Sequence, residues 1–99
     1  MNAPSKQKIA RALGWASSKL GARPDSVDCL AEEGSQRSFM LLNGHGAPVV
    51  LMVGPDKAEN ERWLYLGKRL RAIGLPLPKI LFYNRELGAF IMESLGAVR

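Results

Sequence analysis

The residues best suited to bind a charged ligand lie in the stretch Gly34-Ser35-Gln36-Arg37-Ser38, which separates two apolar runs. A loop of glycine and serine between two strands exposes backbone N–H groups, and such groups bind phosphate oxygens. Arg37 would add a planar guanidinium that grips a phosphate through two parallel hydrogen bonds. The same residues also suit a simple hairpin turn with a solvated arginine, so the pattern by itself leaves both interpretations open.

Two carboxylates, Glu59 and Glu61, precede the apolar residues of a long predicted helix. Glu59 stands four residues before Trp63 and seven before Leu66, which places it on the same helical face as those two side chains. Glu61 lies about 200° around the helix from Glu59, so we expect it to face solvent. We therefore predict Glu59 as the carboxylate that points inward. The alternative is that Glu59 only stabilises the first turn through the helix dipole.

Two other reactive residue types carry no catalytic prediction. His45 lies between two glycines, and the chain has no second histidine to complete a metal site. Cys29 lies in a strand-like run without a nearby histidine, and we predict a small core residue. Because it is the single cysteine, no intrachain disulfide can form, which fits a reducing compartment.

Composition restricts the class of protein. The 99 residues suffice for one domain, and with 46% hydrophobic and 23% charged residues the balance is that of a globular fold rather than a disordered chain. No run approaches the roughly 20 apolar residues that cross a bilayer, and no apolar segment of a signal peptide follows the basic N-terminus. We expect a cytoplasmic protein with no membrane partner.

Periodicity predicts two helices and five strands. Ile9, Leu13, Ala16 and Leu20 form one apolar stripe after a possible cap at Ser5, and Gly21 suits the end of that helix. The second helix carries a predicted stripe of Trp63, Leu66, Leu70 and Ile73, and Gly74 ends it. The expected order is a helix near 5–20, strands at 27–31, 39–42 and 49–53, a helix at 58–73, and strands at 79–83 and 89–93.

This order predicts an α+β fold. Three consecutive strands with short turns, one of them at Asn43-Gly44, imply an antiparallel meander. A five-stranded antiparallel sheet with the long helix packed on one face, plus an extra N-terminal helix, buries the apolar faces. We expect a single domain over 1–99, with 1–24 as a helical extension, 25–93 as sheet and helix, and 94–99 as the start of a hinge.

Four segments of the chain carry a family resemblance: Gly34-Ser35-Gln36-Arg37-Ser38-Phe39, Leu51-Met52-Val53-Gly54-Pro55, Gly74-Leu75-Pro76-Leu77-Pro78-Lys79-Ile80-Leu81 and Phe90-Ile91-Met92-Glu93-Ser94-Leu95-Gly96. Together with the order of the elements, they resemble the N-terminal lobe of the aminoglycoside phosphotransferase and choline kinase family, which has a protein-kinase-like fold. The similarity covers roughly residues 26 to 96 and is closest to the branch of cell-wall amino-sugar kinases.

The resemblance implies an ATP-binding lobe with Mg²⁺ as the accompanying ion. Adenine would lie under Val50 and against Met92, and the backbone of Glu93, Ser94 and Leu95 would bond to it. For Val50 and Met92, ordinary sheet core remains the alternative. Residues 34–38 would bind the phosphates, and Glu59 would point toward the nucleotide. The third-strand lysine of the wider kinase family is replaced by Met52, as in the amino-sugar branch; Arg37 or Lys57 would substitute, with Arg37 preferred.

The resemblance also implies a second lobe that carries the catalytic base and the Mg²⁺ ligands on a His-x-Asp loop, and this sequence holds no such loop. We therefore expect no catalytic residue here, and a partner that is either the missing C-terminal lobe or a second copy of the chain. The acceptor would be a sugar, amino-sugar or aminoglycoside hydroxyl. Two alternatives stay open: a non-catalytic binding module with this fold, and a small nucleic-acid binder, suggested by the net charge of +5.

Overall fold

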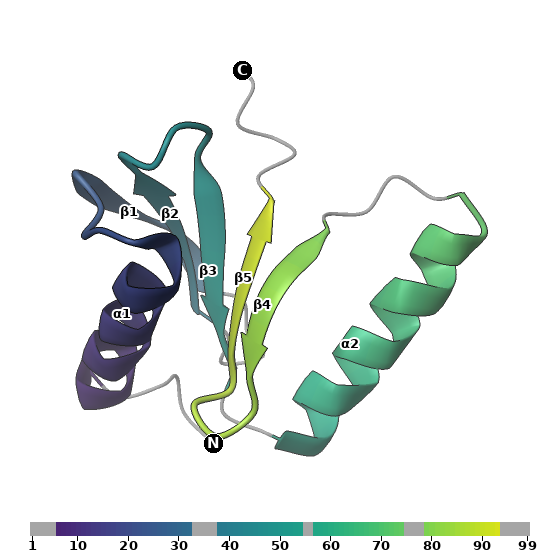
Figure 1. Cartoon of the computed structure of the whole chain (residues 1–99). Helices are drawn as coiled ribbons and strands as arrows, with labels where there is room; N and C mark the ends of the chain where they lie inside the picture. Colours follow the sequence, from purple (N-terminus) through teal and green to yellow (C-terminus); the bar gives the residue numbers. More distant parts are fainter. Residues whose placement is uncertain (1–5, 33–37, 55–56, 75–78, 94–99) are drawn as a thin grey trace.

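The computed structural model describes residues 6–32, 38–54, 57–74 and 79–93, and it contains two helices and five strands (Figure 1). The predicted α+β class is confirmed, and the boundaries of each element fall close to those expected from periodicity. In chain order the elements are α1 (Lys6–Leu20), β1 (Ser26–Glu32), β2 (Ser38–Asn43), β3 (Val49–Val53), α2 (Lys57–Ala72), β4 (Ile80–Asn84) and β5 (Ala89–Glu93).

All five strands join one antiparallel sheet in the order β1-β2-β3-β5-β4. The predicted meander of β1, β2 and β3 is confirmed. The last strand, β5, lies between β3 and β4, so α2 and β4 form an excursion that leaves the sheet after β3 and returns at its edge. Strands β1 and β4 are therefore the two edges of the sheet.

The first helix packs its apolar stripe on one face of the sheet. Ala12 and Ala16 are fully buried, and the small side chains let α1 approach the strands closely. The helix ends where Gly21 adopts a φ of 88° and its N–H donates to the carbonyl of Ser17 at 2.9 Å. This left-handed conformation is the C-terminal cap expected of glycine. The predicted cap at Ser5 lies outside the described residues.

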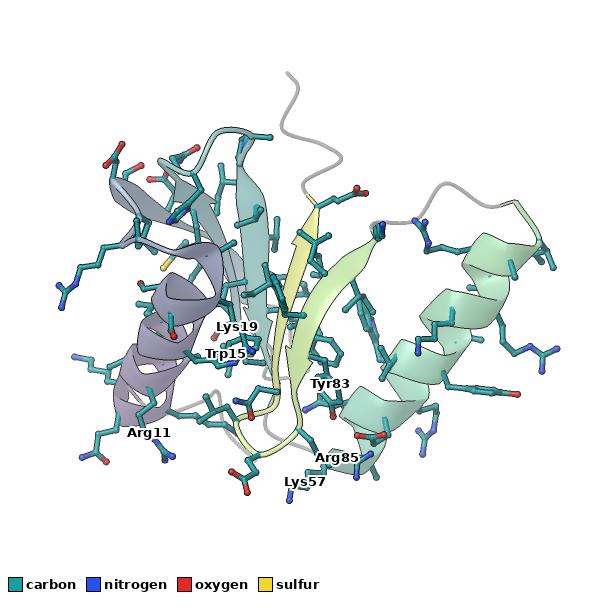
Figure 2. All side chains as sticks on the ribbon, viewed as in Figure 1. Arg11, Trp15, Lys19, Lys57, Tyr83 and Arg85 are labelled. Atoms are coloured by element: carbon teal, nitrogen blue, oxygen red, sulfur yellow. The ribbon has the colours of Figure 1, made fainter. Side chains whose placement is uncertain are left out.

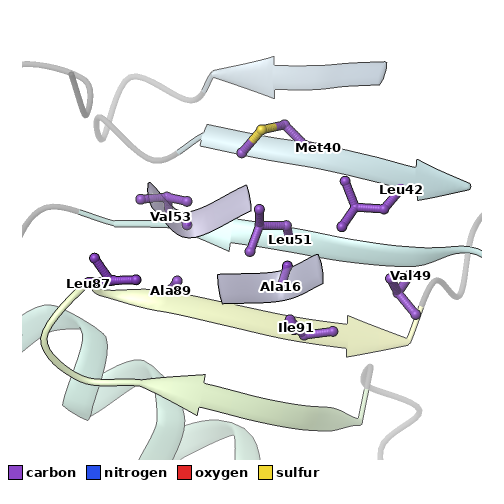
Figure 3. Close-up of a cluster of buried hydrophobic side chains, with 10 residues drawn as sticks. Ala16, Met40, Leu42, Val49, Leu51, Val53, Leu87, Ala89 and Ile91 are labelled. Atoms are coloured by element: carbon purple, nitrogen blue, oxygen red, sulfur yellow. The ribbon is translucent and has the colours of Figure 1, made fainter. Parts of the chain in front are cut away.

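Between α1 and the sheet lies the larger of two apolar clusters, which we call the α1-face core (Figure 3). The strand residues of this core alternate along β2, β3 and β5, as expected when every second side chain of a strand points to the same face. Its buried members are Ala12, Ala16, Met40, Leu42, Val49, Leu51, Val53, Leu87, Ala89 and Ile91.

The second helix covers the opposite face only along its N-terminal half. Asn60 is the one buried residue within Lys57–Ala72, and Trp63 and Leu64 are half-buried. The predicted stripe is wrong at Leu66, which is 51% exposed, and at Ile73, which is 75% exposed, whereas Leu70 is half-buried. The reason is visible in Figure 1, where the axis of α2 diverges from β4 toward the C-terminal end of the helix.

Both helices are tied to the end of β3 by one carbonyl. The oxygen of Gly54 accepts hydrogen bonds from Asn60 Nδ2 at 3.1 Å and from Lys8 Nζ at 3.5 Å. The N–H of Gly54 donates to the carbonyl of Gly88 at 2.9 Å. A methyl group on Gly88, whose φ is 65°, would collide with the Gly54 carbonyl and with Asn60. We call this set, Lys8, Gly54, Asn60 and Gly88, the Gly54 junction.

In the part of the chain that the structure describes, no helix combines the length and the apolar character needed to cross a membrane. The predicted start of a hinge at 94–99 lies outside the described residues.

Candidate functional site

The second face of the sheet carries the residues that the sequence predicts for adenine. Val50 of β3 pairs directly with Met92 of β5, and Met52 pairs with Phe90. Directly opposed residues of antiparallel strands share a face, so Val50, Met52, Phe90 and Met92 lie together. They form the second apolar cluster, the α2-face cluster, with Met52, Phe90 and Met92 buried and Val50 half-buried.

Aromatic side chains fasten α2 to this cluster. The ring of Trp63 meets the ring of Phe90 edge-on at 5.2 Å, and Tyr83 of β4 stacks on Phe90 at 4.4 Å. Such pairs stabilise by about 0.5–1.5 kcal/mol beyond the area they bury. Trp63 therefore fixes the N-terminal half of α2 beside Met92.

Next to the cluster, a groove of about 350 Å³ opens between α2 and β4. We call it the inner groove. Ile80, which pairs with Met92, lies in its wall. Its size is at the low end of the range for small-molecule sites, about 300–1,000 Å³. The residues that line it are Trp63, Leu66, Gly67, Lys68, Leu70, Arg71, Lys79 and Ile80.

Met52, which the resemblance places where a kinase-like lobe carries its third-strand lysine, is fully buried. Its thioether packs with Phe90 and Met92 and brings no charge to this face. A cation for the expected phosphate contact would have to come from another element. Arg37, the preferred substitute in the sequence, lies outside the described residues, and Lys57 is exposed at the start of α2.

The predicted orientation of the two acids in α2 is wrong. Glu59 is exposed, and the buried side chain of the first turn is its neighbour Asn60, held at the Gly54 junction. With Asn60 turned inward, Glu61 turns toward β4 and keeps 38% of its side chain in solvent, so the predicted exposure of Glu61 holds only in part. The phase of the helix is therefore shifted by one residue from the predicted one, because a polar anchor rather than the apolar stripe sets it. A contact between Glu59 and a nucleotide stays a prediction.

Glu61 is part of a network that the sequence did not reveal. Its Oε2 accepts from the hydroxyl of Tyr83 at 2.6 Å and from Arg85 Nε at 2.9 Å, and its Oε1 accepts from Arg85 at 3.2 Å. Figure 2 shows Tyr83 and Arg85 at the end of β4 beside the start of α2. The hydrogen bond from Tyr83, followed by that from Arg85, lowers the pKa of Glu61. Burial, followed by the hydrogen bond to Glu61, raises the pKa of Tyr83.

Ser38 does not lie where a phosphate-binding side chain beside Val50 would be. Its side chain is 4% exposed, and its partner in the register is Val53, a member of the α1-face core. Ser38 thus points to the opposite face of the sheet from Val50 and Met92. Its hydroxyl has no partner among the described residues. The other predicted phosphate-loop residues, Gly34, Ser35, Gln36 and Arg37, lie outside the described residues.

The described part of the predicted hinge is engaged with β4. The N–H of Glu93 donates to the carbonyl of Lys79 at 3.0 Å, and its Oε1 accepts from the N–H of Lys79 at 3.3 Å. The N–H of Glu93 is therefore already satisfied by Lys79, the residue before β4. Ser94 and Leu95, the other two hinge residues, lie outside the described residues.

The two residues set aside in the sequence have ordinary surroundings. His45 Nε2 donates to the carbonyl of Ala22 at 2.7 Å and links the β2–β3 turn to the segment after α1. Cys29 is exposed, so its predicted place in the core is wrong, because β1 is an edge strand. Within the described ranges, no group of three or more His, Cys, Asp or Glu side chains lies close enough together to hold a metal ion.

Comparisons with protein-family models, with curated proteins and with solved structures gave no match to this chain.

Proposed function

We propose that this chain is the nucleotide-binding lobe of an ATP-dependent small-molecule phosphotransferase similar to the aminoglycoside phosphotransferases. The single observation that carries the proposal is the direct pairing of Val50 with Met92 on the face that α2 covers. These are the two side chains that the resemblance assigns to adenine, and they come from strands separated in sequence by α2 and β4. A half-buried valine beside a methionine offers the flat apolar surface on which a purine packs.

The residues present fit a nucleotide base better than they fit a metal ion. The α2-face cluster is apolar, and the described residues hold no group of carboxylates suited to Mg²⁺. In this proposal the chain binds and orients the nucleotide. The catalytic base, the Mg²⁺ ligands and the site for a sugar, amino-sugar or aminoglycoside hydroxyl belong to a second lobe. A cytoplasmic location, where ATP is abundant and a lone thiol stays reduced, would suit this role.

The test is a titration of the ¹⁵N-labelled full chain with ATP, with and without Mg²⁺, followed by the amide shifts. We expect shifts at Val50, Met92 and Glu93, and in the stretches 34–38 and 94–95. The variant Val50→Tyr should weaken binding, because the larger ring fills the space proposed for adenine. Val27→Tyr is the control, since Val27 is 40% exposed and its partner Leu42 belongs to the α1-face core.

A second candidate, a non-catalytic binding module that keeps this fold, is favoured by one observation. Met52 is buried where a kinase-like lobe has its lysine, and Glu59, the acid expected to face it, is exposed. If ATP shifts no amide on the α2 face at millimolar concentration, the nucleotide proposal fails and this candidate takes its place. A third outcome, DNA or RNA binding with steep salt dependence, would indicate a nucleic-acid binder.

A further inference from the structure

The C-terminal half of α2 has hollow apolar surfaces on two sides. The inner groove lies between α2 and β4, and a second groove of about 260 Å³ lies on the outer side of the helix. We call the second one the outer groove. Leu66 and Leu70 line both, so the two grooves meet across these side chains. The outer groove is completed by Tyr65, Arg69 and Ile73.

The exposure of these side chains is high for their size. Tyr65 is 60% exposed, Leu66 51% and Ile73 75%. Single apolar residues at a surface are ordinary, but a contiguous patch with hollows marks an interaction site. Three large apolar residues within three turns of one helix form such a patch. We call it the α2 patch, and it consists of residues 65, 66, 70 and 73 with the two grooves beside them.

Every charged side chain that lines the grooves is basic. The inner groove has Lys68, Arg71 and Lys79, and the outer groove has Arg69. Among the described residues that line either groove there is no acid. Arg69 is also held in place, because it donates to the hydroxyl of Tyr65 at 2.8 Å and lies 5.6 Å from the centre of that ring. The grooves are therefore apolar in their walls and positive at their rims.

We propose that the α2 patch is the docking site for an acidic segment of a partner protein, whose apolar side chains enter the two grooves. Carboxylates of the partner would meet Lys68, Arg69 and Arg71 along the helix. Its leucine or aromatic side chains would fill the hollows on either side of Leu66 and Leu70. Buried apolar anchors with a complementary charged rim are the usual construction of a protein interface.

The charges decide against the other occupants. A second copy docked patch to patch would bring Lys68, Arg69 and Arg71 of both chains together, and like charges at an interface are unfavourable. An anionic bilayer would suit the charges, yet it is a broad surface that does not enter two separate hollows on either side of Leu66 and Leu70. A nucleic acid would satisfy the cations and leave the leucines without apolar partners.

Docking at this site would act on the position of α2. Trp63 lines the inner groove and at the same time contacts Phe90 of β5. A segment in the inner groove would thus hold the divergent end of α2 at a fixed distance from β4. The proposal stands apart from nucleotide binding, since it rests on the exposed half of α2 and not on Val50 or Met92.

The experiment is a selection from a phage-displayed library of random linear peptides on the full 99-residue chain. Counter-selection uses the double variant Leu66→Ser, Lys68→Glu, which alters only exposed side chains and is expected to fold. We expect the enriched peptides to combine Asp or Glu with Leu, Phe or Trp. Bound to the ¹⁵N-labelled chain, they should shift the amides of residues 63–73 and 79–80.

Single variants then separate the two contributions to affinity. Leu66→Ser should weaken the selected peptide about tenfold, the effect of an interface anchor. Lys68→Glu should weaken it about fivefold, with the loss shrinking at high salt. The matched controls are Leu81→Ser and Arg62→Glu, because both residues are exposed and neither lines a groove. Each control should change the affinity less than about twofold.

Several outcomes would overturn the proposal. One is enrichment of basic or purely apolar peptides, and another is a peptide that survives counter-selection on the double variant. A selection without enrichment would also overturn it. A concentration-dependent dimer in analytical ultracentrifugation that Leu66→Ser abolishes would assign the patch to a second copy. Binding to vesicles of anionic phospholipid, lost in Lys68→Glu, would assign it to a membrane surface.

Discussion

The α1 face and the α2 face of the sheet are both apolar, but they are closed to different degrees. Among the described residues, ten buried ones form one core on the α1 face, and Ala12 and Ala16 bring the helix close to the strands. On the α2 face three buried ones form the cluster, and the helix leaves the sheet halfway along its length. The described part of the α1-face core is therefore the larger and the more closed of the two.

The means of attachment differ as well. The α1 helix is held along its whole stripe by apolar contacts from Ile9 to Leu20. The α2 helix is held at one end, by Asn60 at the Gly54 junction, by Trp63 on Phe90 and by Glu61 at Tyr83. These polar and aromatic contacts all lie in the N-terminal half of α2. The α1 helix is therefore part of the closed core, whereas the C-terminal half of α2 presents an exposed surface.

The largest expected difference between the two faces is in the stability lost when a leucine on each face is truncated to alanine. Leu51→Ala, in the fully buried centre of the α1-face core, should lower the free energy of unfolding by about 2–5 kcal/mol. Leu66→Ala should lower it by less than about 0.5 kcal/mol, since that side chain is half exposed. Urea denaturation of both variants measures the difference. Equal losses would mean that α2 is packed as tightly as α1.

The next effect concerns the polar anchor of α2. Asn60→Ala should cost about 1–3 kcal/mol, because it removes a buried hydrogen bond to the Gly54 carbonyl. Arg62→Ala, two residues along the same helix and exposed, is the control and should be near neutral. Hydrogen exchange of the α2 amides would add a local measure. If Asn60→Ala leaves both stability and exchange unchanged, the junction does not hold the helix.

A smaller change in the free energy of unfolding, of opposite sign, is expected in the C-terminal half of α2. Gly67→Ala should stabilise the chain by about 0.4–1 kcal/mol, because alanine suits a helix interior and a methyl group there meets no atom within 4 Å. Thermal unfolding measures the gain. The same change at Gly14 of α1, where space is also open, should give a similar value. A loss at Gly67 alone would show that the inner groove is narrower in solution.

The smallest effect is a pH dependence at the start of α2. The folded-state pKa of Glu61 is lowered, first by the hydrogen bond from Tyr83 and then by that from Arg85. A lowered pKa contributes stability above the unfolded value, near 4.5, and this contribution is lost as the pH falls through the folded value. Glu61→Gln should reduce the pH dependence of the free energy of unfolding at acidic pH, and Tyr83→Phe should reduce it in part. Because the Arg85–Glu61 pair is exposed, salt should weaken the effect.

Much of the fold could be predicted from local patterns. The stripe of α1, its end at Gly21 and the meander of β1, β2 and β3 follow from spacing and turn chemistry, and all three were correct. Apolar periodicity reports directly on burial when a helix lies flat on a sheet, as α1 does. The pairing of Val50 with Met92 is not predicted by any local pattern, because it joins strands that are separated in sequence by α2 and β4.

The phase of α2 could not be predicted in the same way. Its apolar residues Leu64, Tyr65, Leu66, Leu70 and Ile73 surround the helix, so no single stripe is defined by the sequence. The orientation is set by Asn60, a polar residue whose partner carbonyl, Gly54, lies across a turn. For the same reason the sequence pattern predicts Glu59 inward and Glu61 outward. The Tyr83–Arg85 network depends on a contact between distant segments that no local pattern signals.

The position of β5 has a consequence for how the chain reaches this fold. It is the last strand along the chain, yet it fills the gap between β3 and β4. The β1–β3 meander consists of neighbouring strands, but β3 keeps one unpaired edge until β5, which follows α2 and β4 in the chain, has paired with it. Contacts between segments so far apart in sequence form slowly, and an open strand edge recruits other chains. A partly folded chain that lacks β5 therefore presents the free edge of β3 to other chains.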